Sequence, residues 1–382
     1  MTFNTILQFN FPATVRFGPG ASKELGDYLI THGIRRPLIV TDPVVSQLEF
    51  LKQIAGDLKK RNLSVEVFSA IHKNPVKSDV YAGTDLYDDA ERDSVIGIGG
   101  GAALDVARAI VLRINHREDL FKYDDLIGGD VFVTNDVPHF VTIPTTSGTG
   151  SEIGRSAIIS DDNTRQKRIL FSPKLMARIV FADPLLTMDL PPPITAATGM
   201  DALTHNLEAY LAKTPHPLCE GIALEGISLI SQSLEKAVKN PDVASRSMMM
   251  MGSLMGGVAF QKGLGVVHSM AHPLSTLLDV HHGLANAVSL PYGMEFNISG
   301  FEQQFSRIAR ALELTTLSGE AVVRYLANLN SRISIPARLR DLGVKEEHLE
   351  TLADLAEADF AHPNNPKAVR REDFRMLYQQ AY

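Results

Sequence analysis

The stretch DSVIGIGGGAALDVARAI, residues 93–110, carries the clearest signal for the fold of this chain. Its run Ser94–Ile98 is typical of a buried strand, Gly99–Gly101 favour a tight turn, and Ala102–Val111 has the composition of a helix. A glycine turn between a strand and a helix leaves unpaired backbone N–H groups at the positive end of the helix dipole. The stretch therefore predicts an anion site suited to a pyrophosphate, although its spacing is not the G-x-G-x-x-G of the common dinucleotide fingerprint.

Similar short runs rich in β-branched residues recur in the first half of the chain, with helical stretches between them. They are RPLIVTD at residues 36–42, SVEVFSAI at 64–71, HFVTIP at 139–144 and RIVFADP at 178–184. This alternation favours a doubly wound α/β domain with a mostly parallel sheet.

The organisation changes at the triple proline Pro191–Pro193, which cannot lie in a helix interior. Beyond it, segments rich in Ala, Leu and Met with helical periodicity continue to the end of the chain. We therefore expect an α/β domain over residues 1–186 and an all-α domain over residues 187–382. Because clefts between domains often hold ligands, we expect the active site between the two.

Two polar segments follow predicted strands. RPLIVTD ends at Asp42, where a carboxylate suits ribose hydroxyls and would repel a 2′-phosphate, which favours NAD over NADP. FVTIPTTSGTGSE, residues 140–152, places Thr145, Thr146 and Thr149 in a hydroxyl-rich loop, as expected around a phosphate or a nicotinamide carboxamide. Taken singly, Asp42 fits a solvated strand end equally well, and a Ser/Thr/Gly loop is more often a solvated turn.

Five polar residues in two otherwise apolar segments have the spacing of metal ligands. Asp201 and His205 lie four residues apart in GMDALTHNLEAY, so one helix face presents both. His268 and His272 repeat that spacing in GLGVVHSMAHPLSTLLDVHHGLANAVSLP, where His282 precedes a glycine and a close turn would aim its ring inward.

One carboxylate with two or three imidazoles suits Zn²⁺ or Fe²⁺, whereas Ca²⁺ and Mg²⁺ prefer oxygen ligands. A single histidine on an apolar helix face is more often a core residue. Burying several imidazoles without partners costs on the order of 1–3 kcal/mol each, and a shared metal removes that cost. The Met-rich run MMMMGSLMGGVAF, residues 248–260, is expected in the core beside this metal site.

Composition fits a large folded enzyme of the cytoplasm. The 382 residues are 45% hydrophobic, and the net charge of −7 argues against nucleic acid or an anionic membrane as partner. One cysteine, Cys219, excludes an intrachain disulfide and a thiolate cluster. The N-terminal segment lacks the features of a signal peptide, and the longest apolar run is too short to span a bilayer.

Together these segments resemble the iron-containing (group III) alcohol dehydrogenase family, from VRFGPGASKEL near the start to about Asn297. The strongest matches are GGGAALDVAR, PTTSGTGSE, ATGMDALTHNLEAY and the histidine-rich segment that begins at Gly263. The resemblance implies a dehydroquinate synthase-like architecture, a homodimer, NAD and one divalent metal, Fe²⁺ or Zn²⁺.

The resemblance also implies roles for individual residues. Metal ligands would be Asp201, His205, His268 and His282, with His272 as a catalytic residue that does not bind the metal and lies near the nicotinamide. Around the dinucleotide it implies Asp42, Asn74, Gly100, Gly101, Asp105, Thr145, Thr146 and Lys167, to which the motifs themselves add Gly99 and Thr149.

Three positions depart from the family pattern. Ala102 stands where Ser usually follows the glycines, so one side-chain donor to phosphate is missing while the backbone donors remain. Arg108 stands where Lys is common, and His281 is an unusual neighbour of a candidate ligand. We expect His281 either to face the substrate or to be exposed, and we favour exposure.

The implied reaction transfers a hydride between a metal-bound alcohol and the nicotinamide. His272 would relay a proton or shape the nicotinamide edge. The substrate stays open among small alcohols, diols, hydroxy acids, maleylacetate and sugar-acid alcohols, and an acid would need a cation such as Arg155, Lys262 or Arg246. Two alternatives are a lyase of the dehydroquinate synthase type and a non-catalytic metal-binding protein.

Overall fold

A computed structural model describes residues 7–9 and 13–382, so the N-terminal segment considered for a signal peptide lies largely outside the described residues. The described chain forms two compact units. Unit 1 comprises the residues up to Thr146 together with Ser151–Thr187, and unit 2 comprises Ser147–Gly150 and Met188–Tyr382.

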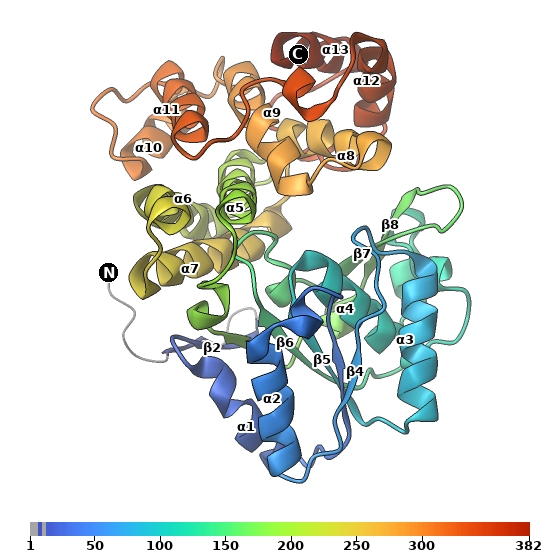
Figure 1. Cartoon of the computed structure of the whole chain (residues 1–382). Coiled ribbons are helices and arrows are strands. Elements are labelled where there is room, and N and C mark those ends of the chain that lie inside the picture. Colours follow the sequence, from blue (N-terminus) through green and yellow to red (C-terminus); the bar gives the residue numbers. More distant parts are fainter. Residues whose placement is uncertain (1–6, 10–12) are drawn as a thin grey trace. The chain divides into compact units, whose positions relative to one another are not determined.

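Unit 1 is built on a seven-stranded sheet with the order β1-β2-β9-β6-β5-β3-β4 (Figure 1). Only the β1–β2 pairing is antiparallel, and every other pairing in this sheet is parallel. A separate antiparallel hairpin pairs β7 with β8. The strands are β1 Leu7–Phe9, β2 Thr14–Phe17, β3 Pro37–Val40, β4 Glu66–Phe68, β5 Ser94–Gly99, β6 His139–Pro144, β7 Ser156–Ser160, β8 Lys167–Phe171 and β9 Ile179–Ala182.

Helices cover both faces of this sheet, because alternate residues of its central strands belong to different cores. Leu38 and Val40 of β3 pack with α3 and α4, whereas Ile39 between them packs with α1 and α2. The predicted doubly wound α/β fold is therefore confirmed. The helices of unit 1 are α1 Leu25–Thr31, α2 Glu49–Lys60, α3 Lys77–Asp89 and α4 Gly101–Asn115.

The glycine turn is shorter than predicted. Strand β5 continues through Gly99, whose φ of 151° favours glycine, and α4 already begins at Gly101 with Gly100 as its N-cap. The sequence predicts that this strand ends at Asp42, but β3 ends at Val40, so Asp42 lies two residues beyond the strand. Register in the parallel sheet brings Gly99 beside Pro144, the last residue of β6.

Unit 2 is helical, as predicted, and residues 188–382, all of which the structure describes, contain no strand. Its central helix is α5, in which every residue from Thr195 to Leu211 is buried. Prolines at its first positions start α5, since a proline needs no hydrogen-bond partner there. The helices are α5 Pro192–Leu211, α6 Pro217–Lys239, α7 Val243–Ala259, α8 Val266–Leu278, α9 His282–Asn297, α10 Glu302–Ala311, α11 Gly319–Arg332, α12 Leu349–Glu357 and α13 Arg371–Ala381.

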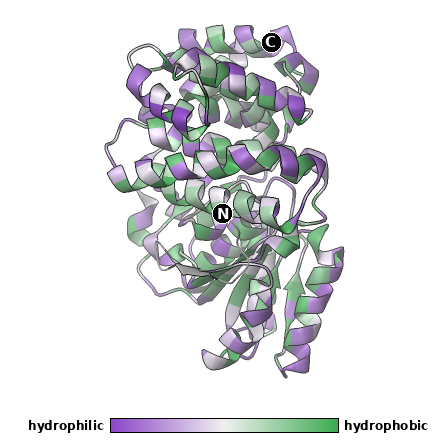
Figure 2. Ribbon diagram, turned by 90° about the vertical axis from the view of Figure 1, so that its left-hand side faces the viewer, coloured by the Kyte–Doolittle hydropathy of each residue, from purple (hydrophilic) through white to green (hydrophobic). Residues whose placement is uncertain are grey.

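Hydropathy follows the burial of these elements. Hydrophobic residues line the inner faces of helices in both units, and hydrophilic residues lie on the outer faces (Figure 2). Met249 and Met250 of the Met-rich run are buried in α7, as predicted. Among the described residues, no helix combines the length and the apolar composition that a bilayer span requires.

Two glycines of α6 allow a direct test of helix packing in unit 2. A methyl group at Gly226 would collide with the side-chain oxygen of Asn206 on α5, whose amide already donates to Ala202 O and Gly252 O. We expect Gly226→Ala to destabilise the protein by about 1–3 kcal/mol. Gly221 has no heavy atom within 4 Å of the added Cβ, so Gly221→Ala should stabilise it by about 0.5–1 kcal/mol. Thermal unfolding measures both variants. A shift of the unfolding midpoint in the same direction for Gly226→Ala and Gly221→Ala would contradict this packing.

Candidate metal and dinucleotide sites

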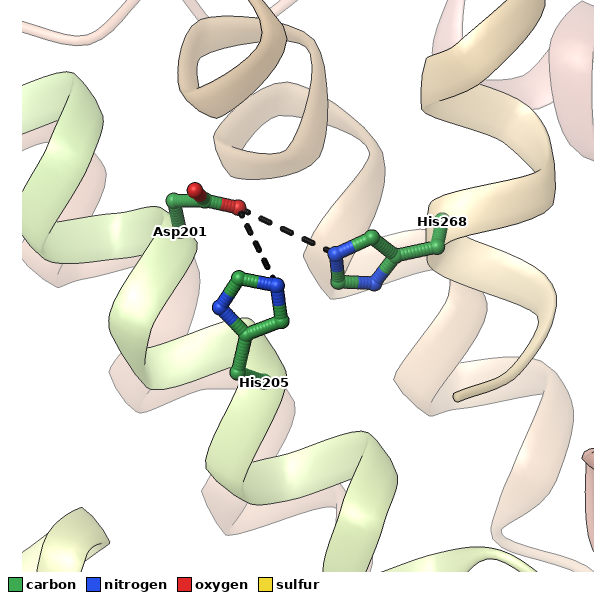
Figure 3. Close-up of side chains that lie close together, drawn as sticks. All are labelled: Asp201, His205 and His268. Carbon is green, nitrogen blue, oxygen red and sulfur yellow. Dashed lines mark ion pairs between the residues drawn. The ribbon is translucent and has the colours of Figure 1, made fainter. Parts of the chain in front are cut away.

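Three predicted metal ligands meet inside unit 2. Asp201 and His205 lie one turn apart on α5, and His268 lies in the first turn of α8. Their candidate ligand atoms all lie within 4.8 Å of one another. Asp201 Oδ1 is 3.9 Å from His205 Nε2 and 3.8 Å from His268 Nε2, and both rings point at the carboxylate (Figure 3).

The fourth predicted ligand, His282, completes the group from a third helix. Its Nε2 lies 3.6 Å from Asp201 Oδ1. The expected close turn at this histidine is wrong, because His282 is the first residue of α9 and Gly283 is helical. A Cβ at Gly283 would collide with Ala197 O, so the glycine lets the start of α9 approach α5.

This donor set fits a divalent zinc or iron ion. Two ligands about 2.1 Å from one tetrahedral ion lie about 3.4 Å apart, close to the 3.6–3.9 Å that separates Asp201 Oδ1 from the three Nε2 atoms. One carboxylate and three imidazoles also match the preferences of these metals. The Asp201 side chain is 2% exposed and that of His282 is 31% exposed, so the group is most accessible on the His282 side.

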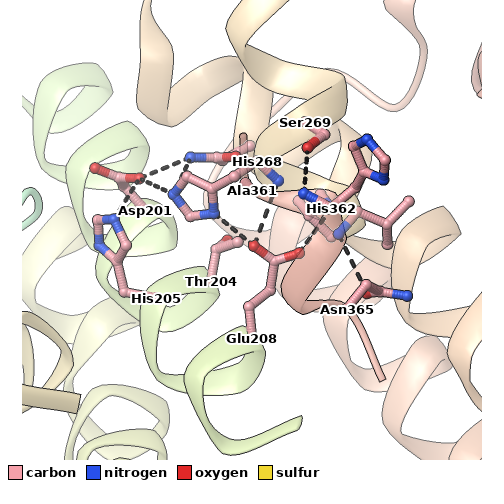
Figure 4. A network of polar contacts seen from close by, with 12 residues as sticks. Asp201, Thr204, His205, Glu208, His268, Ser269, Ala361, His362 and Asn365 are labelled. Carbon is pink, nitrogen blue, oxygen red and sulfur yellow. Dashed lines mark hydrogen bonds and ion pairs between the residues drawn. The ribbon is translucent and has the colours of Figure 1, made fainter. Parts of the chain in front are cut away.

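Three groups that the sequence analysis missed orient these ligands. The His268 Nδ1 atom lies 2.6 Å from Glu208 Oε2 (Figure 4). His205 Nδ1 lies 3.2 Å from Gly148 O. The Asn286 amide donates to Asp201 Oδ1 at 2.8 Å. Hydrogen bonds of this kind set the tautomer and direction of metal-ligating rings. A helix-face argument could have found Glu208, which follows His205 by three residues on α5.

Burial and neighbouring charges shift the carboxyl groups in opposite directions. Burial would raise the pKa of Asp201, but the surrounding His205, His282 and His268 lower that pKa to about 2. Burial raises the pKa of Glu208 to about 7, against the opposing effect of backbone N–H donors, of which Val267 is the first. Asp201 is therefore ionised at neutral pH.

His272 is held beside this group. Its Nδ1 lies 2.7 Å from Asp359 Oδ2, and its ring stacks on Phe360 at 5.2 Å and on His282 at 5.3 Å between centroids. Asp359 also accepts hydrogen bonds from Ser269 Oγ and the Ala361 N–H. The ring orientation is therefore fixed on three sides. Asp359 lies outside every motif considered in the sequence, which gave no signal for it.

Six predicted dinucleotide residues gather around the glycine turn of unit 1. The Thr145 N–H donates to Gly99 O at 3.0 Å, and a Cβ at Gly100 would lie 3.4 Å from the Thr146 side chain. A Cβ at Gly99 would lie 3.4 Å from Asp42 Oδ2, while Asp42 Oδ1 accepts from the backbone of the following turn. Gly101 starts α4, so its N–H belongs to the unpaired donors of the helix N-terminus.

A buried hydroxyl beside this turn supports a ligand there. Thr41 Oγ1 lies 4.0 Å from the position of a Cβ at Gly99 and has no hydrogen-bond partner among the described residues. Because a buried polar group without a partner is costly, a bound ligand is one way to satisfy it.

Four other predicted dinucleotide residues lie elsewhere or have other partners. The Asp105 carboxylate accepts from Ser151 Oγ at 2.6 Å and from the Ile158 N–H at 3.1 Å, bonds that serve the fold of unit 1. Asn74 is exposed, Lys167 is half-buried on β8, and Thr149 belongs to unit 2. None of these contacts places these four residues at the glycine turn.

The cationic residues considered above are mostly committed to internal bonds. Arg108 is fully buried and donates to Leu175 O, Ser151 Oγ and Ser156 O, so its several N–H groups replace the single ammonium of the usual lysine. Arg246 donates to Thr195 Oγ1 and Leu190 O. Lys262 donates to Tyr210 O and pairs with Glu220. Arg155 is half-buried, and so is His281, for which we favoured exposure.

Comparison with known proteins agrees with this geometry. Residues 12–184 match the family model described as iron-containing alcohol dehydrogenase, and residues 195–382 match the one described as Fe-containing alcohol dehydrogenase family, C-terminal. The chain belongs to the iron-containing alcohol dehydrogenase family. It is therefore an oxidoreductase that acts on CH–OH groups, which confirms the predicted class and disfavours the lyase and the non-catalytic alternatives.

Individual relatives cover almost the whole chain. The chain is 35% identical over 359 residues to the 4-hydroxybutyrate dehydrogenase of Cupriavidus necator, covering 91% of this chain and 93% of that protein. It is 33% identical over 378 residues to the NAD-dependent methanol dehydrogenase of Bacillus methanolicus, covering 97% and 98%. A crystal structure of 1,3-propanediol oxidoreductase matches with a TM-score of 0.92 and 32% identity, covering 100% of both chains.

Adjacent histidines provide a matched test of the fourth ligand. We expect His282→Ala to lower the affinity for Zn²⁺ by about tenfold or more, because it removes one of four ligand atoms. His281→Ala, one residue earlier, should leave that affinity unchanged within about threefold, which is less than the loss of about tenfold or more that follows removal of a hydrogen-bond partner of a ligand. Competition with a chromophoric chelator measures both variants. Equal losses in the two variants would refute the assignment of His282.

Proposed function

We propose that this protein is a metal-dependent, NAD-linked alcohol dehydrogenase whose metal is held by Asp201, His205, His268 and His282. The observation that carries the proposal is the convergence of three imidazole Nε2 atoms at 3.6–3.9 Å from one buried carboxylate oxygen. A divalent zinc or iron ion bound there would act as a Lewis acid toward the oxygen of an alcohol or carbonyl substrate.

The residues around His272 suit it to move a proton. Since Asp359 accepts from Nδ1, the neutral ring carries its proton on that atom and keeps the Nε2 lone pair. Stacking on Phe360 and His282 prevents the ring from turning away. We assign His272 the role of proton relay for the substrate hydroxyl and Asp359 the role of holding its tautomer.

The glycine turn of unit 1 is the proposed dinucleotide site. Backbone N–H groups at the start of α4 suit a pyrophosphate, and the Thr41 hydroxyl is a further donor without a partner among the described residues. Asp42 Oδ2 lies beside the turn, where it favours the ribose hydroxyls of NAD over the 2′-phosphate of NADP. The predicted cleft between the domains and the predicted domain limits stay predictions.

For the substrate we propose a small primary alcohol or diol. Relatives are named for methanol, 1,3-propanediol and 4-hydroxybutyrate, which all carry a primary hydroxyl on a short chain. A hydroxy acid would need a cation for its carboxylate, but Arg246 and Lys262 are committed to internal bonds. We further propose a homodimer in the cytoplasm, a compartment compatible with the single buried cysteine, Cys219.

The direct test is reduced-cofactor formation with purified protein, across short alcohols, diols and hydroxy acids, with NAD⁺ and NADP⁺. We expect NADH to form with alcohols and diols, to stop after chelation, and to return when Zn²⁺ or Fe²⁺ is added back. NADPH formation at an equal rate would contradict the role of Asp42. A metal-replete protein that binds NAD⁺ and forms no NADH with any substrate would contradict the proposed reaction.

A second test concerns the proton relay. We expect Asp359→Asn to lower kcat by about tenfold or more and His272→Ala by about a hundredfold, while the metal content of both stays at the wild-type value. In the asparagine variant an NH₂ group must face either His272 Nδ1 or the Ala361 N–H, so the favoured tautomer is lost. Unchanged turnover in His272→Ala would remove this residue from the mechanism.

A further inference from the structure

A second buried carboxylate, that of Glu208, lies behind the predicted metal ligands. Glu208 is on α5, one turn after His205, and its side chain is 1% exposed. Oε1 accepts from the Val267 N–H at 2.7 Å, and Oε2 lies 2.6 Å from His268 Nδ1 (Figure 4). One carboxylate thus binds both the start of α8 and the ring of a candidate ligand.

The contact with His268 decides which ring nitrogen carries the proton. In its ionised form, which the positive charge of a bound divalent ion would favour, the Glu208 carboxylate is only an acceptor, so the neutral ring must place its proton on Nδ1. Nε2, which faces Asp201 Oδ1 at 3.8 Å, then keeps its lone pair for a metal. The opposite tautomer would put a proton on Nε2 and exclude His268 from coordination.

The charge of Glu208 also matters for a buried ion. Asp201 and Glu208 each carry one negative charge when ionised, and together they balance a divalent cation. The Asp201 side chain is 2% exposed and that of His268 is 1% exposed, so solvent screens these charges little. A divalent ion held by Asp201 and neutral imidazoles alone would leave one uncompensated positive charge in a medium where that is costly.

We propose that Glu208 is a positioning residue of the metal site, which holds His268 in the tautomer that ligates and balances the charge of a divalent ion. The proposal rests on the proposed function, since it requires a metal at Asp201, His205 and His268. It goes beyond the ligand set because it assigns metal affinity to a residue that does not touch the ion.

A purely structural role does not account for this arrangement. Glu208 caps the first turn of α8, but so does Asn365, whose Oδ1 accepts from the Val266 N–H at 3.2 Å. A neutral amide serves that purpose at Asn365. Only the contact with His268 Nδ1 calls for a group that cannot donate.

The test compares Zn²⁺ affinities of full-length variants by competition with a chromophoric chelator. We expect Glu208→Gln to lower the affinity by about 10- to 100-fold, because its NH₂ group must face either His268 Nδ1 or the Val267 N–H. Thermal unfolding without metal reports separately on any loss of fold. A Glu208→Gln affinity within about threefold of wild type would overturn the proposal, since the loss of a partner that orients a metal ligand costs about tenfold or more.

Two control variants separate the tautomer from other effects. Asn365→Ala removes a neighbouring partner of the α8 backbone and leaves the Glu208–His268 contact in place. Asp359→Asn breaks a similar carboxylate–histidine pair at His272, which does not ligate. Both should keep wild-type affinity. A loss in Asn365→Ala equal to that in Glu208→Gln would overturn the proposal in favour of helix capping.

A measurement on the wild-type protein keeps the proposal testable if Glu208→Gln does not fold. Nitrogen-15 NMR of labelled histidines in the metal-free protein, at a pH well above 7 where Glu208 is ionised, should show His268, assigned by its loss in His268→Gln, with its proton on Nδ1. A proton on Nε2 would overturn the proposal. Failure of the proposed function is distinct, since Zn²⁺ would then bind wild type and Asp201→Ala equally.

Discussion

The helical unit depends on one buried negative charge, that of Asp201 on the central helix α5. Every residue of this helix from Thr195 to Leu211 is buried, so the carboxylate cannot reach water. Burial alone would raise the pKa of Asp201 and neutralise it, and the surrounding histidines together with the Asn286 amide keep it ionised. The positions of α8 and α9 follow from this constraint, because each begins with a turn that delivers a histidine to the same oxygen.

Helix α8 carries two carboxylate–histidine pairs with nearly equal geometry and different consequences. His268 and His272 lie one turn apart, and their Nδ1 atoms are 2.6 Å and 2.7 Å from Glu208 and Asp359. Each carboxylate frees the Nε2 atom of its ring. His268 directs that atom at Asp201, whereas His272 is held between Phe360 and His282 and stays available for a proton. In the proposed mechanism, the same pairing therefore prepares one ring for coordination and the next for proton transfer.

Local pattern was enough to predict the fold and the candidate metal ligands that the structure brings together, since both depend on neighbours in the sequence. The β-branched runs and the i, i+4 spacing of Asp201 and His205 are examples. Local patterns fail where contacts between distant parts of the chain determine the partner of a residue. Asp359 comes from a loop 87 residues beyond His272, and Asp105 is drawn into bonds with Ser151 and Ile158 that no local pattern announces. Gly283, next to His282, does not form the predicted turn. It lets the start of α9 approach α5.

The uneven exposure of the four candidate ligands has a kinetic consequence. Three of them are almost completely enclosed, whereas the His282 side chain is 31% exposed and sits at the first turn of α9. First turns of helices open more readily than helix interiors, because their N–H groups have no partner within the helix. An ion would therefore exchange with solvent by way of His282. The residence time of such an ion would then be governed by the start of α9.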